Sequence, residues 1–145
     1  MSDTLVNKKV SVERCIRQIR SYYEHRGELP FERDHLRQDA IAMNLQRAIK
    51  LCIDMANHLI RTRKLGLPQG SRDSFALLEQ EGFIGADLAG QLKRMVGFRN
   101  VLVHEYRELD LGIMIDVIEN RLHALLDFTV DVLNAAGAHT QDPDS

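Results

Sequence analysis

Apolar residues along this chain recur at steps of three and four, which is the spacing of an amphipathic helix. Helices are predicted in this way over residues 8–26, 32–64, 71–81, 86–104 and 110–135. Gly or Pro residues lie between most of these segments, and no stretch alternates apolar and polar residues as a strand would. The pattern therefore predicts an all-α fold, an up-and-down helical bundle of about five helices.

The second and fifth predicted helices carry the broadest apolar faces. Two apolar seams lie side by side over residues 41–60, which suits a central helix packed against more than one neighbour. Apolar residues over 111–132 repeat at a heptad-like spacing. Such seams usually fill the core of a bundle, although some form the interface of a dimer. For the short third helix we expect Ser71 as the N-cap, with Asp73 or Ser74 as alternatives.

The composition is that of an ordinary soluble globular protein. The 145 residues are 44% hydrophobic and 28% charged, which suits one domain with a substantial core. We expect this domain to span residues 1–136 and the polar tail at 137–145 to be disordered. No apolar run approaches the roughly 20 residues that a membrane span needs, and the first residues lack the apolar core of a signal peptide. These features predict a cytoplasmic protein without a membrane segment, in which Cys15 and Cys52 are buried free thiols.

The segment most informative about function is residues 99–106, Arg-Asn-Val-Leu-Val-His-Glu-Tyr. In a helix over residues 86–103, Arg99 falls on an otherwise apolar stripe. The other members of that stripe are Leu88, Leu92, Met95 and Leu102. A guanidinium cannot lose its charge, and burying it without a partner costs several kcal/mol. We therefore expect Arg99 to pair with a carboxylate such as Asp54, to line a cleft, or to await an anionic ligand.

Arg99, Asn100, His104 and Tyr106 form a candidate site for RNA cleavage without a metal. Histidine titrates near neutral pH and can move a proton, while arginine can hold a phosphate through two hydrogen bonds. His104 would deprotonate a ribose 2′-hydroxyl or protonate the leaving oxygen, and Arg99 would hold the scissile phosphate. This reaction leaves a cyclic phosphate. Asn100 lies one helical turn before His104, where its side chain can hydrogen-bond the ring and orient it.

The spacing of Arg99 and His104 raises a geometric difficulty. Residues five apart lie about 140° from one another around a straight helix, so one helix does not aim both at one phosphate. Either the helix ends or kinks near Val103, or two copies of the chain contribute to one composite site. We favour the dimer, because it also buries the stripe that contains Arg99. The alternative without chemistry is an Arg99 paired in the core and a His104 that interacts only with the last carbonyls of its helix.

The charge of the chain allows only a local interaction with nucleic acid. The net charge of −2 argues against a surface coated with positive charge. Lys93, Arg94 and Arg107 nevertheless lie within 15 residues of one another, together with Arg99 and His104. We take Lys93, Arg94 and Arg107 as possible RNA contacts, and the alternative is a solvated helix face.

Metal and nucleotide chemistry within the chain itself has little support in the sequence. Asp54 and His58 stand four residues apart, a spacing that can hold a metal, but two ligands are too few for a site. No Gly-rich phosphate loop is present. We therefore expect no metal site, no cofactor and no use of ATP by this chain itself.

The string Met95-Val-Gly-Phe-Arg-Asn-Val-Leu-Val-His-Glu-Tyr106 resembles the signature of HEPN-domain proteins, and more closely that of their HepT-like branch. The HepT-like motif is Arg, four residues, His, one residue and Tyr. Arg99, His104 and Tyr106 match its fixed positions, and Asn100 fills the polar position after the Arg. The resemblance also covers the long helix around residues 48–58 and the short helix around residues 74–79.

The resemblance implies a HEPN-like helical bundle that dimerises with its motifs facing a shared cleft. It also implies the toxin of a toxin–antitoxin pair, a metal-independent endoribonuclease with Arg99 and His104 catalytic and Asn100 supporting. The implied partners are a second copy of the chain, an RNA substrate (tRNA or mRNA) and a minimal nucleotidyltransferase antitoxin that transfers AMP from ATP to Tyr106. AMP at Tyr106 would add negative charge and bulk beside the cationic residues.

Two other functions remain open from the sequence. One is a non-catalytic HEPN module that binds nucleotide or RNA as a subunit of a nucleotidyltransferase complex. The other is a purely structural helical dimer. An AMP adduct at Tyr106 after co-expression with a nucleotidyltransferase would separate this last possibility from the others.

Overall fold

The computed structural model describes residues 3–25 and 27–140, with side chains described up to residue 137. Every regular element in these residues is helical. The longer helices are α1 (Asp3–Glu24), α2 (His35–Arg63), α3 (Ser71–Gln80), α4 (Ala86–His104) and α6 (Leu122–Thr140). The shorter elements are the 3₁₀ turns η1 (Phe31–Arg33) and η2 (Tyr106–Glu108), helix α5 (Leu111–Asp116) and the π-helical segment η3 (Val117–Arg121). The predicted all-α fold is confirmed.

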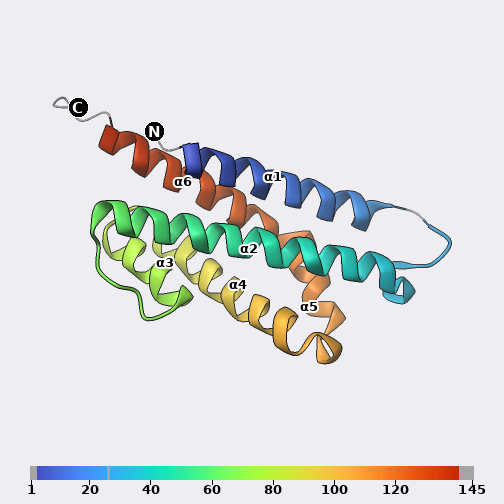
Figure 1. Cartoon of the computed structure of the whole chain (residues 1–145). Helices are drawn as coiled ribbons and strands as arrows, with labels where there is room; N and C mark the ends of the chain where they lie inside the picture. The colour runs from blue at the N-terminus through green and yellow to red at the C-terminus, as the bar shows by residue number, and fades with distance from the viewer. Residues whose placement is uncertain (1–2, 26, 141–145) are drawn as a thin grey trace.

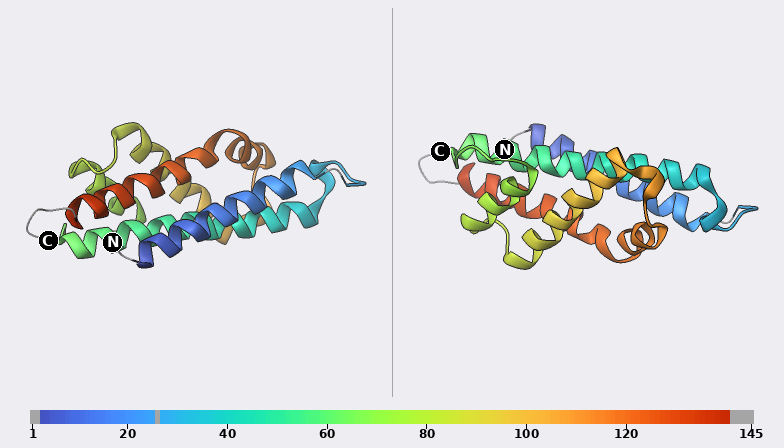
Figure 2. Two further views of the ribbon diagram at one scale, coloured as in Figure 1. Left: turned by 90° about the horizontal axis from the view of Figure 1, so that it is seen from above. Right: turned by 90° about the horizontal axis from the view of Figure 1, so that it is seen from below.

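Helix α2 is the central helix of the bundle, as its two apolar seams predict. It contacts α1, α3, α4 and α6. In Figure 1, α1 and α6 lie on one side of α2, and α3 and α4 lie on the other. Figure 2 shows α1, α2 and α6 alongside one another. Because α1, α2, α4 and α6 alternate in direction, the start of α2 and the end of α4 lie at the same end of the bundle.

The core lies between α2 and the helices around it. Phe75 of α3 packs edge to face on Phe128 of α6, with ring centroids 5.2 Å apart, and both side chains are buried. A large apolar side chain stabilises the fold by about 1.5–3 kcal/mol when it is fully buried. Cys15 and Cys52 are buried free thiols, which confirms the prediction for both.

One arginine fastens the connection between α1 and α2. Arg37 is only 7% exposed, and its guanidinium donates to backbone carbonyls at the end of α1 and in the loop that follows. These are the carbonyls of Tyr22, Tyr23, His25 and Leu29, at 3.0, 3.2, 2.6 and 3.3 Å. The Nε of Arg37 donates to Asp34 at 2.8 Å, and Asp34 caps α2 by accepting from the backbone N–H of Arg37 at 3.1 Å. This cap explains why α2 begins at His35 and not at the predicted residue 32.

The start of α3 differs from the prediction. Gly70, and not Ser71, immediately precedes the first helical residue. Asp73 accepts a hydrogen bond from the backbone N–H of Gln69 at 2.8 Å, and the Ser74 hydroxyl donates to Asn57 Oδ1 at 2.6 Å. The prediction of a Ser71 N-cap is wrong. Two side chains of the first turn, Asp73 and Ser74, instead hold the helix to the preceding loop and to α2 through hydrogen bonds.

The predicted fifth helix is divided into α5, η3 and α6. Asp110 caps α5 by accepting from the backbone N–H of Gly112 at 2.8 Å. Helix α6 continues to Thr140, beyond the predicted end of the domain at residue 136, and residues 141–145 of the predicted tail lie outside the described residues. Within the part of the chain that the structure describes, no helix is long and apolar enough to cross a membrane.

Candidate active site

Helix α4 carries most of the candidate site and has the bounds that the sequence predicts, Ala86–His104. It ends because Glu105 leaves the helical conformation, with φ −137° and ψ 33°, while its N–H still bonds to the Val101 carbonyl at 2.8 Å. The predicted stripe faces inward, and its members Leu92, Met95 and Leu102 are buried. The helix therefore presents Arg99 from a face that is otherwise part of the core.

Arg99 is half-buried and has no partner among the described residues. Its Nε is buried and makes no hydrogen bond, and none of the ion pairs in the described part of the chain includes it. The predicted alternative partner, Asp54, is occupied by Lys50 at 2.5 Å and Lys8 at 4.0 Å. A guanidinium whose Nε has lost water without gaining an acceptor favours an anionic ligand. Of the three expectations for Arg99, pairing with Asp54 is therefore wrong.

His104 is the last residue of α4, and its side chain is exposed. Asn100, one turn earlier, is also exposed, and no hydrogen bond joins the two among the described side chains. The expected role of Asn100 in orienting the His104 ring is therefore absent from this single chain. Both side chains are free to contact a second molecule at this end of the bundle.

A single chain does not bring Arg99 and His104 to one point. Helix α4 does end near Val103, at His104, but it stays α-helical up to that residue without a kink. The two residues thus lie about 140° from one another around the helix axis. A composite site formed by two copies therefore remains the expected arrangement.

Tyr106 lies in η2, directly after the end of α4. Its hydroxyl donates to Asp39 Oδ1 of α2 at 2.5 Å, across 67 positions of the chain. The ring is half-buried against the core. Burial raises the pKa of the Tyr106 hydroxyl, and the hydrogen bond to Asp39 and the charge of Asp39 raise it further. Tyr106 is therefore a protonated phenol at neutral pH that donates its proton in a hydrogen bond to a carboxylate.

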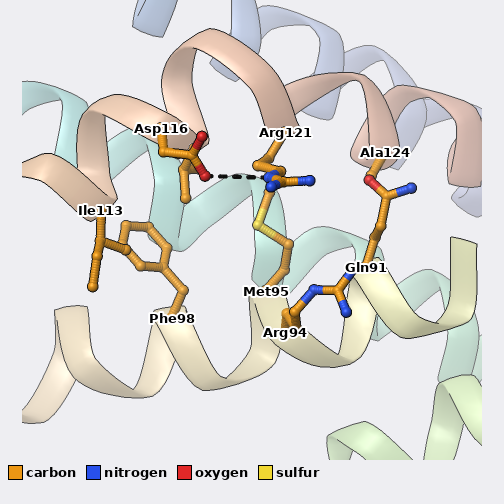
Figure 3. A pocket seen from close by; sticks show the side chains of 9 residues that line it. Gln91, Arg94, Met95, Phe98, Ile113, Asp116, Arg121 and Ala124 are labelled. Carbon is orange, nitrogen blue, oxygen red and sulfur yellow. Dashed lines mark hydrogen bonds and ion pairs between the residues drawn. The ribbon is translucent and has the colours of Figure 1, made fainter.

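The three predicted RNA contacts differ in their surroundings. Lys93 pairs with Glu79 of α3 at 3.8 Å, whereas Arg94 and Arg107 are exposed. Arg94 lines a cavity of about 180 Å³ between α4 and the α5–η3 region. Figure 3 shows Arg94 on α4 and, on the facing segment, the ion pair that Asp116 makes with Arg121 at 3.2 Å.

Two further residues near the site escape sequence reasoning, namely Arg72 and Asp39. The Nε of Arg72 donates to the Lys93 carbonyl at 3.3 Å, and its guanidinium lies on Gly97, where an added Cβ would stand 2.6 Å from Nη2. Arg72 and Asn100 line the same shallow surface cavity. A glycine inside a helix that otherwise packs well is the signal for this close approach. No local signal marks Asp39, because its partner lies far along the chain.

The comparisons with known proteins agree with this site. A family model described as "Ribonuclease HepT-like" matches residues 12–132. The chain belongs to the HepT-like ribonuclease family. The resemblance to the HepT-like branch, which the motif ending at Tyr106 indicated, is therefore confirmed.

Relatives of this HepT-like chain include an mRNA nuclease and a putative RNase. It is 43% identical over 135 residues to the mRNA nuclease HepT of Shewanella oneidensis, covering 93% of this chain and 99% of the relative. It is 26% identical over 117 residues to a putative RNase of Archaeoglobus fulgidus, covering 80% of this chain and 88% of the relative.

Solved structures extend the likeness of this HepT-like chain to the fold. The tri-AMPylated HEPN toxin of S. oneidensis in complex with the MNT antitoxin matches with a TM-score of 0.85 and 43% identity, over 93% of this chain and 99% of that one. A toxin–antitoxin complex with AMP-PNP matches with a TM-score of 0.85 and 42% identity, over 92% and 99%. The expected HEPN-like helical fold and the expected ribonuclease class are confirmed. The roles of single residues stay predictions.

Within the described residues, no three His, Cys, Asp or Glu side chains gather as a protein metal site requires. Asp54, one half of the weak pair noted in the sequence, is held by lysines instead of by His58. The candidate site therefore consists of cations, one histidine, one asparagine and one tyrosine, with Asp39 bonded to the tyrosine.

Proposed function

We propose that this chain is a metal-independent endoribonuclease toxin that acts in the cytoplasm and cleaves RNA in a cleft shared by two copies. We further propose that a partner nucleotidyltransferase switches it off by adding AMP to Tyr106. The single observation that carries the proposal is the unpartnered guanidinium of Arg99 on the inward face of α4. The nuclease and toxin names of its relatives support the same conclusion.

The chemistry follows from the residues at the end of α4. Arg99 holds the scissile phosphate, and Lys93, Arg94 and Arg107 contact the flanking backbone of the RNA. The ribose 2′-oxygen forms a bond to phosphorus, the bond from phosphorus to the 5′-oxygen breaks, and a cyclic phosphate remains. His104 removes the proton from the 2′-hydroxyl or supplies one to the leaving 5′-oxygen. Asn100 supports His104 in the assembled cleft.

The dimer completes the site because one chain separates Arg99 from His104. Val103, beside His104, is an apolar side chain that is 43% exposed, which supports contact with a second molecule here. The test is a mixture of Arg99→Ala and His104→Ala proteins. If each site combines Arg99 of one copy with His104 of the other, a mixed dimer contains one intact site and the mixture regains cleavage. A mixture that stays inactive although mixed dimers form excludes the shared site.

Neutralisation at Tyr106 follows from its position two residues after His104. AMP on the hydroxyl adds a phosphodiester charge and a nucleoside beside the groups that hold RNA, so repulsion and steric block act together. The tri-AMPylated state of the S. oneidensis toxin supports this role.

The decisive experiment measures RNA cleavage by the purified, unmodified chain beside His104→Ala, in EDTA, with mRNA and tRNA as substrates. We expect His104→Ala to lose about 10²–10⁴-fold in rate while its circular dichroism is unchanged. Equal cleavage by both proteins would remove His104 from the mechanism. Inactivity of both, with Tyr106 shown unmodified by mass spectrometry, would favour the non-catalytic binding module.

A further inference from the structure

The hydrogen bond between Tyr106 and Asp39 joins the proposed acceptor of AMP to a carboxylate of the same chain. Asp39 lies one turn after the start of α2, and its side chain is exposed. Among the described residues its carboxylate has one side-chain partner, the Tyr106 hydroxyl at 2.5 Å. No cation neutralises it there. The carboxylate is therefore an acceptor that is aimed at one oxygen and is open to a second protein.

We propose that Asp39 is the proton acceptor when a nucleotidyl group is transferred to Tyr106, so that the toxin supplies the base for its own neutralisation. This inference rests on the proposed function, in which Tyr106 receives AMP. Asp39 touches the reacting oxygen and is therefore a catalytic residue of the transfer, although it has no part in the cleavage of RNA.

The transfer balances with the groups that are present and the nucleoside triphosphate that the partner enzyme delivers. Tyr106 Oη forms a bond to the α-phosphorus, and the bond from that phosphorus to the oxygen bridging to the β-phosphate breaks. Pyrophosphate leaves with the electron pair of the broken bond. The phenolic proton moves along the existing hydrogen bond to Asp39 Oδ1. Because the raised pKa of Tyr106 keeps its hydroxyl protonated at neutral pH, an acceptor at this position is needed as the new bond forms.

The same carboxylate changes the docking of η2 once AMP is attached. The ester oxygen of modified Tyr106 has no proton to donate, so the hydrogen bond to α2 is lost. The new phosphodiester anion then stands beside Asp39, and two negative charges at this distance repel. Modification therefore releases Tyr106 from α2 and moves η2, the turn that directly follows His104.

The chain contains a matched control for this pair. Tyr23 donates to Glu119 Oε2 at 2.5 Å, and burial together with Glu119 raises the pKa of Tyr23 to about 12. This second tyrosine–carboxylate bond joins α1 to η3 and includes no residue of the motif. Glu119→Gln thus makes the same chemical change as Asp39→Asn at a pair that has no part in the transfer.

The experiment follows the intact mass of the unmodified chain with ATP, Mg²⁺ and a partner nucleotidyltransferase of the MNT class. Wild type, Asp39→Asn, Asp39→Glu, Glu119→Gln and Tyr106→Phe are compared. We expect Asp39→Asn to lower the turnover rate at saturating ATP about 100-fold or more without changing the KM for ATP, because Asp39 contacts the nucleophile and not the nucleotide. Asp39→Glu restores part of the rate, Glu119→Gln reacts like wild type, and Tyr106→Phe stays unmodified.

The outcomes separate this inference from the proposed function. Modification of Asp39→Asn at the wild-type rate overturns the role of Asp39 and leaves the neutralisation at Tyr106 standing. A wild-type chain that gains no AMP overturns the neutralisation itself. If Asp39→Asn and Asp39→Glu are equally slow and both lose helical circular dichroism, the contact is structural and the inference fails.

Discussion

Arg37 is buried and Arg99 is half-buried on helices of one bundle, and their guanidiniums have opposite surroundings. Arg37 donates to four backbone carbonyls and to Asp34, and it lies over the ring of Phe31 at 5.3 Å from the centroid. Arg99 has a buried Nε without a hydrogen bond, and it has no ion pair among the described residues. The Arg37 guanidinium holds the loop after α1 in place, whereas Arg99 is left without an acceptor among the described residues.

The difference shows how a structural cation is distinguished from a functional one. A buried charge is tolerated when acceptors within the fold satisfy it, and the fold then depends on it. A buried charge without acceptors destabilises the free protein and persists where a ligand will supply them. By this criterion we expect Arg37 to stabilise the fold and Arg99 to bind an anion.

The largest expected effect is on cleavage by Arg99→Ala. We expect the rate of RNA cleavage to fall about 10²–10³-fold, because the phosphate loses its charge-assisted donor. The free energy of unfolding should stay unchanged or rise, since an unsatisfied charge is removed. Parallel measurements of cleavage and of urea unfolding check both parts. A variant that unfolds readily would show that Arg99 has a partner in the fold after all.

Arg37→Ala should have the opposite result. We expect the free energy of unfolding to fall by about 3 kcal/mol, because carbonyls and the Asp34 carboxylate lose a buried cation. Urea unfolding measures this loss. At a temperature where the variant remains folded, its cleavage rate should match wild type. Loss of cleavage without loss of stability would contradict the comparison.

The cap beside Arg37 gives a smaller effect that depends on pH. The backbone hydrogen bond from Arg37, and then its side-chain hydrogen bond, hold the pKa of Asp34 below its ordinary value. Because the folded pKa is below the unfolded one, Asp34 stabilises the fold above the ordinary carboxyl range of about pH 4, and this contribution is lost as pH falls through the folded pKa. Unfolding of wild type and Asp34→Asn between neutral and acid pH checks this. The variant should lose less stability on acidification, and identical curves would contradict the prediction.

The smallest effect belongs to the exposed cations around Arg99. Arg94→Gln and Arg107→Gln should each lower cleavage only a few-fold, because exposed side chains contact phosphates through screened charges. The effect should shrink as salt increases. A loss as large as that of Arg99→Ala would place Arg94 or Arg107 among the catalytic groups. Lys64→Gln, at the far end of α2, is the matched loss of positive charge.

Sequence reasoning found the candidate site where the signal was local. Arg99 stood out as the one charged residue on an apolar stripe. The bounds of α4 were predictable because a glycine precedes the helix and the apolar stripe stops near its end. Sequence reasoning missed the role of Arg37, because most partners of Arg37 are backbone carbonyls. Every residue has a backbone carbonyl, so no residue type marks these partners in the sequence. It missed Asp39 for another reason, since only the packing of η2 on α2 brings Tyr106 to it. The Ser71 cap failed because tertiary contacts of Ser74 override local preference.

The π-helical segment η3 determines which side chains of the last part of the chain face the core. Buried Met114, Ile118 and Leu122 follow one another at consecutive steps of four, and the wider turn keeps all three on the inner side. A π-helical turn holds about one residue more than an α-helical turn, so deleting one residue from η3 would let it close into a regular α-helix with α5 in nearly the same phase. Adding one residue would instead turn α5 by about 100° against α6 and carry Met114 toward solvent. Many loops tolerate insertions and deletions alike, but we expect this segment to tolerate a deletion far better than an insertion.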